Sequence, residues 1–274
     1  MNIEKLKAFL DGVYYVYARR EIVNPDPLYF LYDYDDVRDR EITGLIASSL
    51  AYGRVTQIMK SVKKVLDCLG KRPHEFLVNN DKFEVVPDGF KHRFTTAYDV
   101  NNMLANITGI LREHGSIESF LGECLKMSDN ELFSGLDKFA DRISLNRKEG
   151  SFSLVSAPRD GSACKRLFLY LRWMVRNLDV DPGGWSILSP SQLIVPTDTH
   201  IFRIASALHL THRKYPNFSS AVDISHSFSK CCHADPIRYD FPLCRLGLRL
   251  HYLNINFFSL GETYYTTYSS PVIH

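Results

Sequence analysis

The chain of 274 residues is 45% hydrophobic and 23% charged, which is enough apolar material for a folded core and excludes a disordered chain. Its 33 basic and 31 acidic residues leave a formal net charge of +2, so any affinity for nucleic acid must come from local basic patches. No stretch approaches the roughly 20 apolar residues of a membrane span, so we expect a cytoplasmic protein without a membrane partner.

Helical spacing of apolar residues dominates the first half of the chain. Residues 3–13 place apolar side chains at i, i+3 and i+7 among charges, as in an amphipathic helix and unlike a signal peptide. After a Pro- and Asp-rich crossing at 24–36, residues 39–53 read as a buried helix whose small residues allow close packing. Residues 55–69 repeat the helical pattern and end at Gly70, which suits a helix C-cap. The same period predicts further helices at 100–111 and around Phe120 and Phe133.

The second half contains two segments that begin with helix-start signals. A loop at 153–163 leads into a strongly amphipathic helix over 164–178. An irregular segment ends at Asp198, and residues 199–210 continue with helical spacing. Asp198 therefore stands where an N-cap belongs, and its carboxylate can accept hydrogen bonds from the first amides of that helix. Because strand-like alternation is scarce along the chain, we predict an all-α protein.

The cysteines give no sign of a disulfide framework or of a metal site. The six of them lack C-x-x-C pairing and regular spacing, so reduced thiols are expected. Cys231, Cys232 and His233 are adjacent, but three consecutive side chains cannot readily converge on one ion. The sequence also lacks the clustered carboxylates or His pairs that a metal-dependent nuclease uses. We therefore expect no metal and no other cofactor.

The segment IVPTDTHIFRIA, residues 194–205, resembles the catalytic segment of endonuclease III and its relatives in the helix-hairpin-helix superfamily of DNA glycosylases. Their pattern V-D-T-H-I-F-R-V has its counterpart in the run from Asp198 to Ile204. The resemblance implies that Asp198 is the catalytic carboxylate. Cleavage of an N-glycosidic bond develops positive charge on the deoxyribose, which a nearby carboxylate stabilises. A helix N-terminus would lower the pKa of this carboxylate and keep it ionised.

The segment PRDGSACKRL, residues 158–167, resembles the hairpin L-P-G-V-G-x-K-T that precedes the aspartate in the lyase members of the superfamily. Gly161 matches the first glycine, and Ala163 takes the place of the second. Lys165 falls on the lysine that attacks the sugar C1′ and forms a Schiff base. An alanine in place of the second glycine weakens the close backbone approach to a DNA phosphate, although alanine remains small.

The spacing of the two candidate catalytic residues departs from the endonuclease III pattern. Lys165 and Asp198 are farther apart in the chain than in that branch, and residues 179–192 read as an insertion. The longer separation is similar to that in the archaeal 8-oxoguanine glycosylase branch, which favours a lysine nucleophile. Such a lysine must spend time neutral, which the neighbouring Arg166 can assist. The alternative is a solvated lysine in the first turn of a helix, with Arg172 as the fallback electrophilic residue.

The resemblance to the broad superfamily spans roughly residues 38–255. Over the full length, the stretches 39–58, 162–176, 181–185 and 189–200 resemble a bacterial family whose activity is unassigned. The four-cysteine loop that follows the last helix of endonuclease III has no counterpart in residues 261–274, which contain no cysteine. An iron–sulfur cluster is therefore not expected.

Enzymes of this kind extrude the target nucleotide, so they need a wedge and an aromatic or apolar base pocket. The resemblance places Gln57 at the wedge, with Arg54 and Tyr52 beside it, although a solvated turn is the alternative. Tyr52, Trp173 and Trp185 are the base-pocket candidates, with an ordinary core position as the alternative for Trp173. Contacts to DNA are further expected from Gly161, Ala163, Arg166, His200 and Arg203. Charged helix faces could add phosphate contacts through Lys60, Lys63, Lys64, Lys71 and Arg72.

These observations predict a two-lobed, all-α fold like that of the helix-hairpin-helix glycosylases. Residues 36–160 would form one lobe and residues 1–35 with 161–274 the other, with DNA in the groove between them. The expected function is a base-excision repair glycosylase with abasic-site lyase activity. It would act as a nucleoid-associated monomer on double-stranded DNA that contains an abasic site or a damaged base such as oxidised guanine. The alternative is a non-catalytic DNA- or RNA-binding protein that retains the fold.

Overall fold

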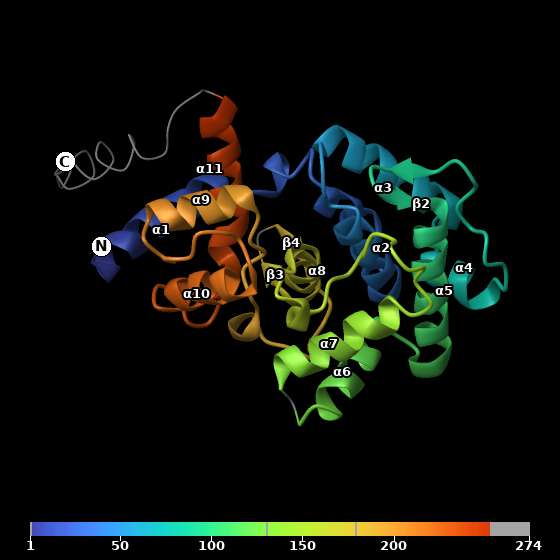
Figure 1. Cartoon of the computed structure of the whole chain (residues 1–274). Helices are drawn as coiled ribbons and strands as arrows, with labels where there is room; N and C mark the ends of the chain where they lie inside the picture. The colour runs from blue at the N-terminus through green and yellow to red at the C-terminus, as the bar shows by residue number, and fades with distance from the viewer. Residues whose placement is uncertain (1, 130, 179, 253–274) are drawn as a thin grey trace.

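The computed structural model describes residues 2–129, 131–178 and 180–252, and this part of the protein is built almost entirely of helices (Figure 1). The α-helices are α1 (Ile3–Tyr17), α2 (Val37–Ser49), α3 (Val55–Leu69), α4 (Pro73–Asn79), α5 (Ala97–His114), α6 (Ile117–Lys126), α7 (Leu132–Ile143), α8 (Lys165–Val175), α9 (Thr199–Ala207), α10 (Phe218–Ser229) and α11 (Asp240–Tyr252). Short 3-10 helices join them: η1 (Arg20–Ile22), η2 (Pro27–Asp33), η3 (Pro158–Asp160), η4 (Pro190–Gln192) and η5 (Pro236–Tyr239). The prediction of an all-α protein is confirmed.

Strands occur only as two minimal antiparallel pairs within the described residues. β1 (Lys91–His92) pairs with β2 (Thr95–Thr96), and β3 (Asn177–Leu178) pairs with β4 (Asp181–Pro182). Each pair is two residues deep, so neither forms a layer that could bury a core. They shape two connections between helices.

The helix boundaries follow the caps that the sequence supplies. α3 has the bounds predicted from its apolar spacing, and Gly70 ends it with a φ of 74°. α5 begins three residues before its predicted apolar period, because Thr96 and Asp99 form a capping box at Ala97. In that box the backbone N–H of Thr96 donates to Asp99 Oδ2 at 2.8 Å. The capping residues, and not the apolar spacing, thus mark where α5 begins.

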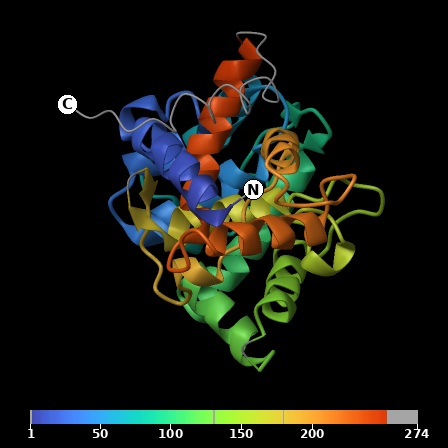
Figure 2. The same ribbon diagram turned by 90° about the vertical axis from the view of Figure 1, so that its left-hand side faces the viewer.

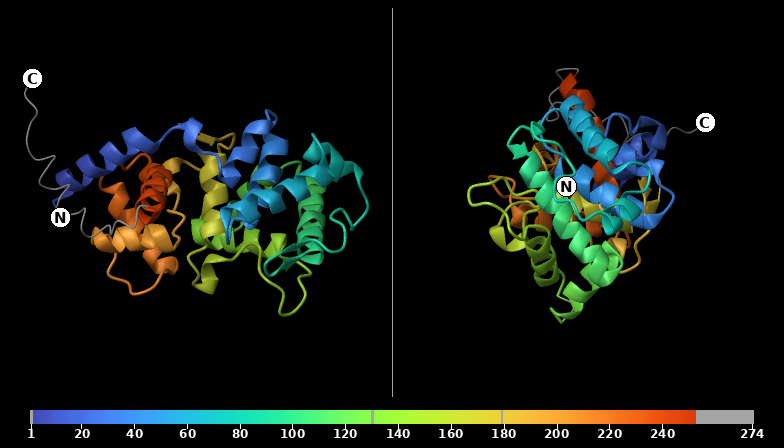
Figure 3. Two further views of the ribbon diagram at one scale, coloured as in Figure 1. Left: turned by 90° about the horizontal axis from the view of Figure 1, so that it is seen from above. Right: turned by 90° about the vertical axis from the view of Figure 1, so that its right-hand side faces the viewer.

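The helices fall into two groups that lie side by side along the long axis of the molecule (Figures 1 and 3). One group contains α2 to α7, and the other contains α1, α9, α10 and α11, with α8 and the β3–β4 pair between them. The face seen in Figure 2 is formed by α1, α10 and α11. α8 packs on α2, while α1 and α9 both pack on α11. The buried apolar side chains of both groups form one continuous cluster.

Buried ion pairs fasten α8 to the segments that follow it. Arg172 pairs with Asp181 at 3.1 Å and also with Asp240, while Arg176 pairs with Asp181 and, at 2.8 Å, with Asp235. Both arginine side chains are almost fully buried. Breaking such a network from one side typically costs about 3–5 kcal/mol. Arg172 therefore connects α8 to the β3–β4 pair and to α11. Its guanidinium is buried in these ion pairs, so the interpretation of Arg172 as the fallback electrophilic residue is wrong.

Both tryptophans are core residues, so the prediction that they line a base pocket is wrong. Trp173 is 1% exposed and Trp185 is 5% exposed. The indole Nε1–H of Trp185 donates to Glu41 Oε2 at 3.0 Å. The same buried carboxylate accepts the backbone N–H groups of Ile117 at 2.7 Å and Glu118 at 3.1 Å, at the start of α6. Trp185 thereby attaches the segment after β4 to α2 and α6.

Replacing Trp185 with phenylalanine tests this structural role. The substitution removes one of the three donors to the buried carboxylate of Glu41, so we expect it to lower the free energy of unfolding by about 1–3 kcal/mol. Denaturant unfolding measures the loss, and Tyr15→Phe, at a side chain that is 80% exposed, serves as the control. Unchanged stability combined with weakened DNA binding would instead indicate the stacking role that the sequence suggested.

Candidate active site

Asp198 is the N-cap of α9, as its place in the sequence predicted. One carboxylate oxygen, Oδ1, accepts the backbone N–H groups of His200 and Ile201, each at 2.9 Å. The residue itself is extended, with φ −99° and ψ −175°. Because a single oxygen satisfies both amides, Oδ2 is available to another partner.

The segment before α8 turns through two residues in the left-handed region. η3 is followed by Gly161 at φ 72°, and Cys164 at φ 44° caps α8 without a side-chain hydrogen bond. Gly161 adopts this conformation at no steric cost, whereas a residue such as Cys164 is strained there. The carbonyl of Gly161 accepts the backbone N–H of Phe218 at 3.0 Å, which attaches the turn to the start of α10. Lys165 is thereby fixed as the first residue of α8.

Lys165 and Asp198 meet where α8 and α9 begin. Lys165 Nζ lies 3.3 Å from Asp198 Oδ2, the oxygen that does not cap α9. The side chain of Lys165 is 34% exposed and that of Asp198 is 18% exposed, so solvent reaches both members of the pair. The structure therefore brings together the two residues that the sequence singled out for chemistry, and it does not seal them in the core.

The electrostatics of the pair favour an ammonium ion facing a carboxylate. Burial opposes the charge of Asp198, but the ammonium of Lys165 and the N–H groups of α9 outweigh it and lower the pKa of the carboxyl group. Burial likewise opposes the charge of Lys165, but the carboxylate of Asp198 outweighs it and raises the pKa of the amine. The positive ends of two helix dipoles add to the attraction for negative charge here. At rest Lys165 is therefore protonated.

One face of α11 forms the buried side of this site. Asp240, Cys244 and Gly247 follow one another at i, i+4 and i+7, and a Cβ built on Gly247 would lie 3.0 Å from Cδ1 of Ile204 in α9. Burial raises the pKa of the Cys244 thiol to about 12, and the carboxylates of Asp198 and Asp240 contribute to the rise. Cys244 is thus a neutral thiol beside the pair. No motif in the sequence predicts this position for Cys244, because only tertiary packing brings α11 to the pair.

Arg166 points away from the pair and holds a second set of residues against α8. Its guanidinium donates to the carbonyl of Ser49 at 3.2 Å and to that of Ser153 at 2.7 Å. It also lies 5.4 Å from the ring centroid of Tyr52 and 4.7 Å from that of Phe152. Burial lowers the pKa of Arg166 to about 10. Arg166 joins the end of α2 and the loop before η3 to the start of α8.

The remaining predicted DNA contacts are spread over both helix groups. Arg54 is the exposed N-cap of α3, and Gln57 is exposed in its first turn, where Gln57 Nε2 donates to Ser61 Oγ at 3.2 Å. The wedge candidate thus lies on a helix and not in a free turn. Tyr52 is half-buried, and its hydroxyl donates to the carbonyl of His92 at 2.7 Å. Among the others, Gly161 and Arg203 are exposed, whereas Ala163 and His200 are half-buried.

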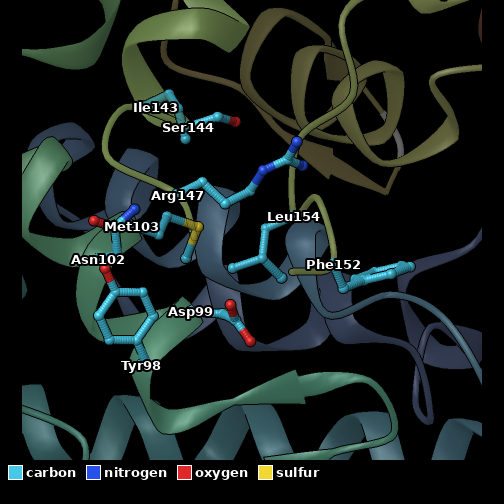
Figure 4. Close-up of a pocket in the computed structure, with 9 residues that line it drawn as sticks. All are labelled: Tyr98, Asp99, Asn102, Met103, Ile143, Ser144, Arg147, Phe152 and Leu154. Atoms are coloured by element: carbon cyan, nitrogen blue, oxygen red, sulfur yellow. The ribbon is translucent and has the colours of Figure 1, made fainter. Parts of the chain in front are cut away.

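Two hollows in the described part of the chain lie apart from the pair. The first, shown in Figure 4, has a volume of about 20 Å³ and lies between Tyr98, Asn102, Arg147 and Phe152. That volume accommodates one water molecule and not a nucleobase. The second, about 570 Å³ and open, lies at Lys71 and its neighbours near the start of α4. Neither includes Lys165 or Asp198.

The fold and this geometry define an all-α protein with a lysine–aspartate pair at two helix N-termini. Residues 26–249 match the family model described as protein of unknown function (DUF2400), and the chain belongs to that family. No curated protein and no solved structure matches the chain.

Membrane-spanning helices and metal-binding clusters are both absent from the residues that the structure describes. No helix there is long and apolar enough to cross a bilayer. No group of three His, Cys, Asp or Glu side chains is arranged there to hold a metal ion. The tail 261–274, to which the expectation of no iron–sulfur loop refers, lies outside the described residues.

Proposed function

We propose that the protein is a DNA glycosylase of base-excision repair with abasic-site lyase activity, in which Lys165 is the nucleophile and Asp198 its anionic partner. The observation that carries the proposal is the 3.3 Å contact between Lys165 Nζ and Asp198 Oδ2 at the start of two helices, with both side chains partly exposed. The resemblance of the two segments to the catalytic aspartate and hairpin lysine of the glycosylase superfamily supports it.

The arrangement supplies the parts that the reaction needs. Lys165 releases a proton to solvent while Asp198, whose Oδ2 lies 3.3 Å from Nζ, stays ionised, and the neutral amine attacks the sugar C1′. The N-glycosidic bond breaks, its electron pair leaves with the base, and the base takes up the proton that the attacking nitrogen, now bonded to C1′, gives up. The nitrogen lone pair then opens the sugar ring, O4′ becomes a hydroxyl group, and an iminium ion links Lys165 to C1′. Loss of a C2′ proton expels the 3′ phosphate and nicks the strand.

Asp198 suits this role because its two oxygens have different tasks. Oδ1 is held by two backbone N–H groups, which fixes the orientation of the carboxylate. Oδ2 faces Lys165, where positive charge develops on the sugar in the transition state. An oriented charge of this kind contributes to catalysis without having to reorganise during the reaction.

A panel of duplexes with one lesion each tests the proposal. The panel contains oxidised guanine, other damaged bases and an abasic site, and the measured quantities are released base and strand cleavage under single-turnover conditions. We expect release of at least one base, with cleavage at the abasic site. Tight, salt-dependent binding of DNA with no release and no cleavage on any duplex would favour the non-catalytic binder instead.

The raised pKa of Lys165 predicts an alkaline pH profile. The reactive form is the neutral amine, and the carboxylate of Asp198 holds that form at a low population at pH 7. Single-turnover base excision should therefore rise by about tenfold for each pH unit between pH 6 and 9. The carboxyl group of Asp198, with a lowered pKa, stays ionised throughout this range.

Asp198→Asn supplies the control for this profile. Removing the carboxylate removes the main cause that raises the pKa of Lys165, so the residual activity should reach its alkaline plateau at a lower pH than that of the wild type. A profile that is flat between pH 6 and 9 for the wild-type protein would contradict a lysine nucleophile.

A further inference from the structure

Three aromatic side chains from distant parts of the chain form a row on the side of α8 that Arg166 faces. Tyr52 follows α2, Phe152 lies in the loop before η3, and Phe94 lies in the turn between β1 and β2. The ring centroids of Tyr52 and Phe152 are 4.8 Å apart, and those of Phe152 and Phe94 are 5.8 Å apart, each pair tilted by 36°. Phe94 is 64% exposed. The row therefore runs from the half-buried Tyr52 to the largely exposed Phe94.

Cationic groups flank this row along its length. The Arg166 guanidinium lies 4.7 Å from the Phe152 ring, and that of Arg93 lies 5.4 Å from the Phe94 ring. The Arg93 side chain runs along Gly53, where an added Cβ would come within 2.8 Å of Arg93 Cδ. Arg54 follows Gly53 in the chain, and neither Arg93 nor Arg54 forms an ion pair with any described residue. Exposed aromatic rings and unpaired cations suit a ligand with both flat rings and negative charge.

Hydrogen bonds of the buried His92 position the turn that carries Phe94. His92 is fully buried, and its two ring nitrogens lie 3.0 Å from Ser61 Oγ and 3.0 Å from the carbonyl oxygen of Tyr52. Arg93 adopts a left-handed conformation with φ 54°, which is strained for a residue with a side chain. The buried His92 therefore fixes the position of the exposed Phe94 ring.

The row begins beside the proposed active site. Lys165 and Arg166 are consecutive at the start of α8, and one faces Asp198 while the other faces Phe152 and Tyr52. In Figure 4 the Phe152 ring points away from the small hollow that Tyr98 and Asn102 line. A strand bound at Lys165 would thus lie at the start of α8, which Arg166 connects to the aromatic row.

We propose that Phe94 and Phe152 form a stacking platform for one unpaired nucleobase of a DNA strand bound at the Lys165–Asp198 pair, with Arg93 and Arg54 contacting the phosphates beside it. This inference rests on the proposed function. Stacking of a base on an exposed aromatic ring accounts for about tenfold or more in affinity. The platform would favour duplexes in which a base has lost its partner.

Binding to two duplexes in the Lys165→Ala background tests the platform without turnover. One duplex is fully paired, and the other contains a single 2-aminopurine opposite an abasic site. We expect Phe94→Ala to weaken binding of the second duplex about tenfold or more, to abolish the quenching of 2-aminopurine, and to change binding of the paired duplex less than threefold. Phe94→Trp should retain both the affinity and the quenching.

Phe83→Ala is the matched control, because that ring is 42% exposed and contacts Tyr98 instead of the row. It should bind both duplexes like the parent. Equal binding of the second duplex by the parent and by Phe94→Ala would overturn the platform, and base release by the wild type would then still support the glycosylase. Failure of the parent to bind either duplex would overturn both. Tighter, Phe94-dependent binding of single-stranded RNA than of DNA would overturn the assignment to a DNA strand.

Discussion

Asp198→Asn is expected to slow base excision by about a hundredfold or more, as the loss of an oriented catalytic charge typically does. The asparagine Oδ1 can still accept the N–H groups of His200 and Ile201, so the start of α9 is preserved. The neutral amide cannot stabilise positive charge on the sugar. Single-turnover excision measures the effect, and DNA binding should stay within a few fold of the wild type.

A second substitution separates the cap from the charge. Asp198→Ala removes both, so it should lose about 1 kcal/mol of stability in addition to activity, whereas Asp198→Asn should lose little stability. If Asp198→Asn excised bases at the wild-type rate, Asp198 would be a helix cap alone and the proposed chemistry would fail.

Lys165→Ala is expected to abolish covalent trapping of the protein on abasic DNA by borohydride. The reagent reduces the imine between the lysine and the sugar, and without the amine no imine forms. We expect the adduct to fall below about 1% of the wild-type amount, in line with removal of a nucleophile. The side chain is 34% exposed, so its truncation should leave the fold intact.

Lys165→Arg is the matched control for this experiment. The guanidinium keeps a positive charge beside Asp198 but stays protonated and cannot act as the nucleophile. DNA binding should therefore be retained while trapping is lost. Undiminished trapping by either variant would show that another amine reacts.

The parts of the site that sequence reasoning found are those with local signals. Asp198 was found because the run from Asp198 to Ile204 resembles the catalytic segment of endonuclease III and its relatives. Its position as an N-cap, which the apolar helical period after it predicted, is confirmed by the structure. Lys165 was found because residues 158–167 resemble the hairpin of the lyase members of that superfamily, and Gly161, which matches the first glycine of the hairpin, does adopt a positive φ. Their proximity depends on how α8 and α9 pack. No local pattern in the residues between these helices predicts that packing.

The residues that sequence reasoning misjudged depend on long-range contacts. Trp185 follows two glycines, a pattern typical of an exposed loop, yet its indole meets the buried Glu41 far away in the chain. Phe94 and Phe152 have no motif, and their row is assembled from three separate connections. The helices were predictable from the spacing of apolar residues and from the capping residues. The contacts between side chains that are distant in the sequence were not.

The most direct test of the proposed chemistry is the position of the covalent link. Wild-type protein is trapped with borohydride on a duplex containing an abasic site, digested, and analysed by mass spectrometry for the peptide that carries the sugar remnant. We expect the modification on Lys165. A modification on a different lysine, or no adduct although the duplex is bound, would contradict a nucleophilic role for Lys165.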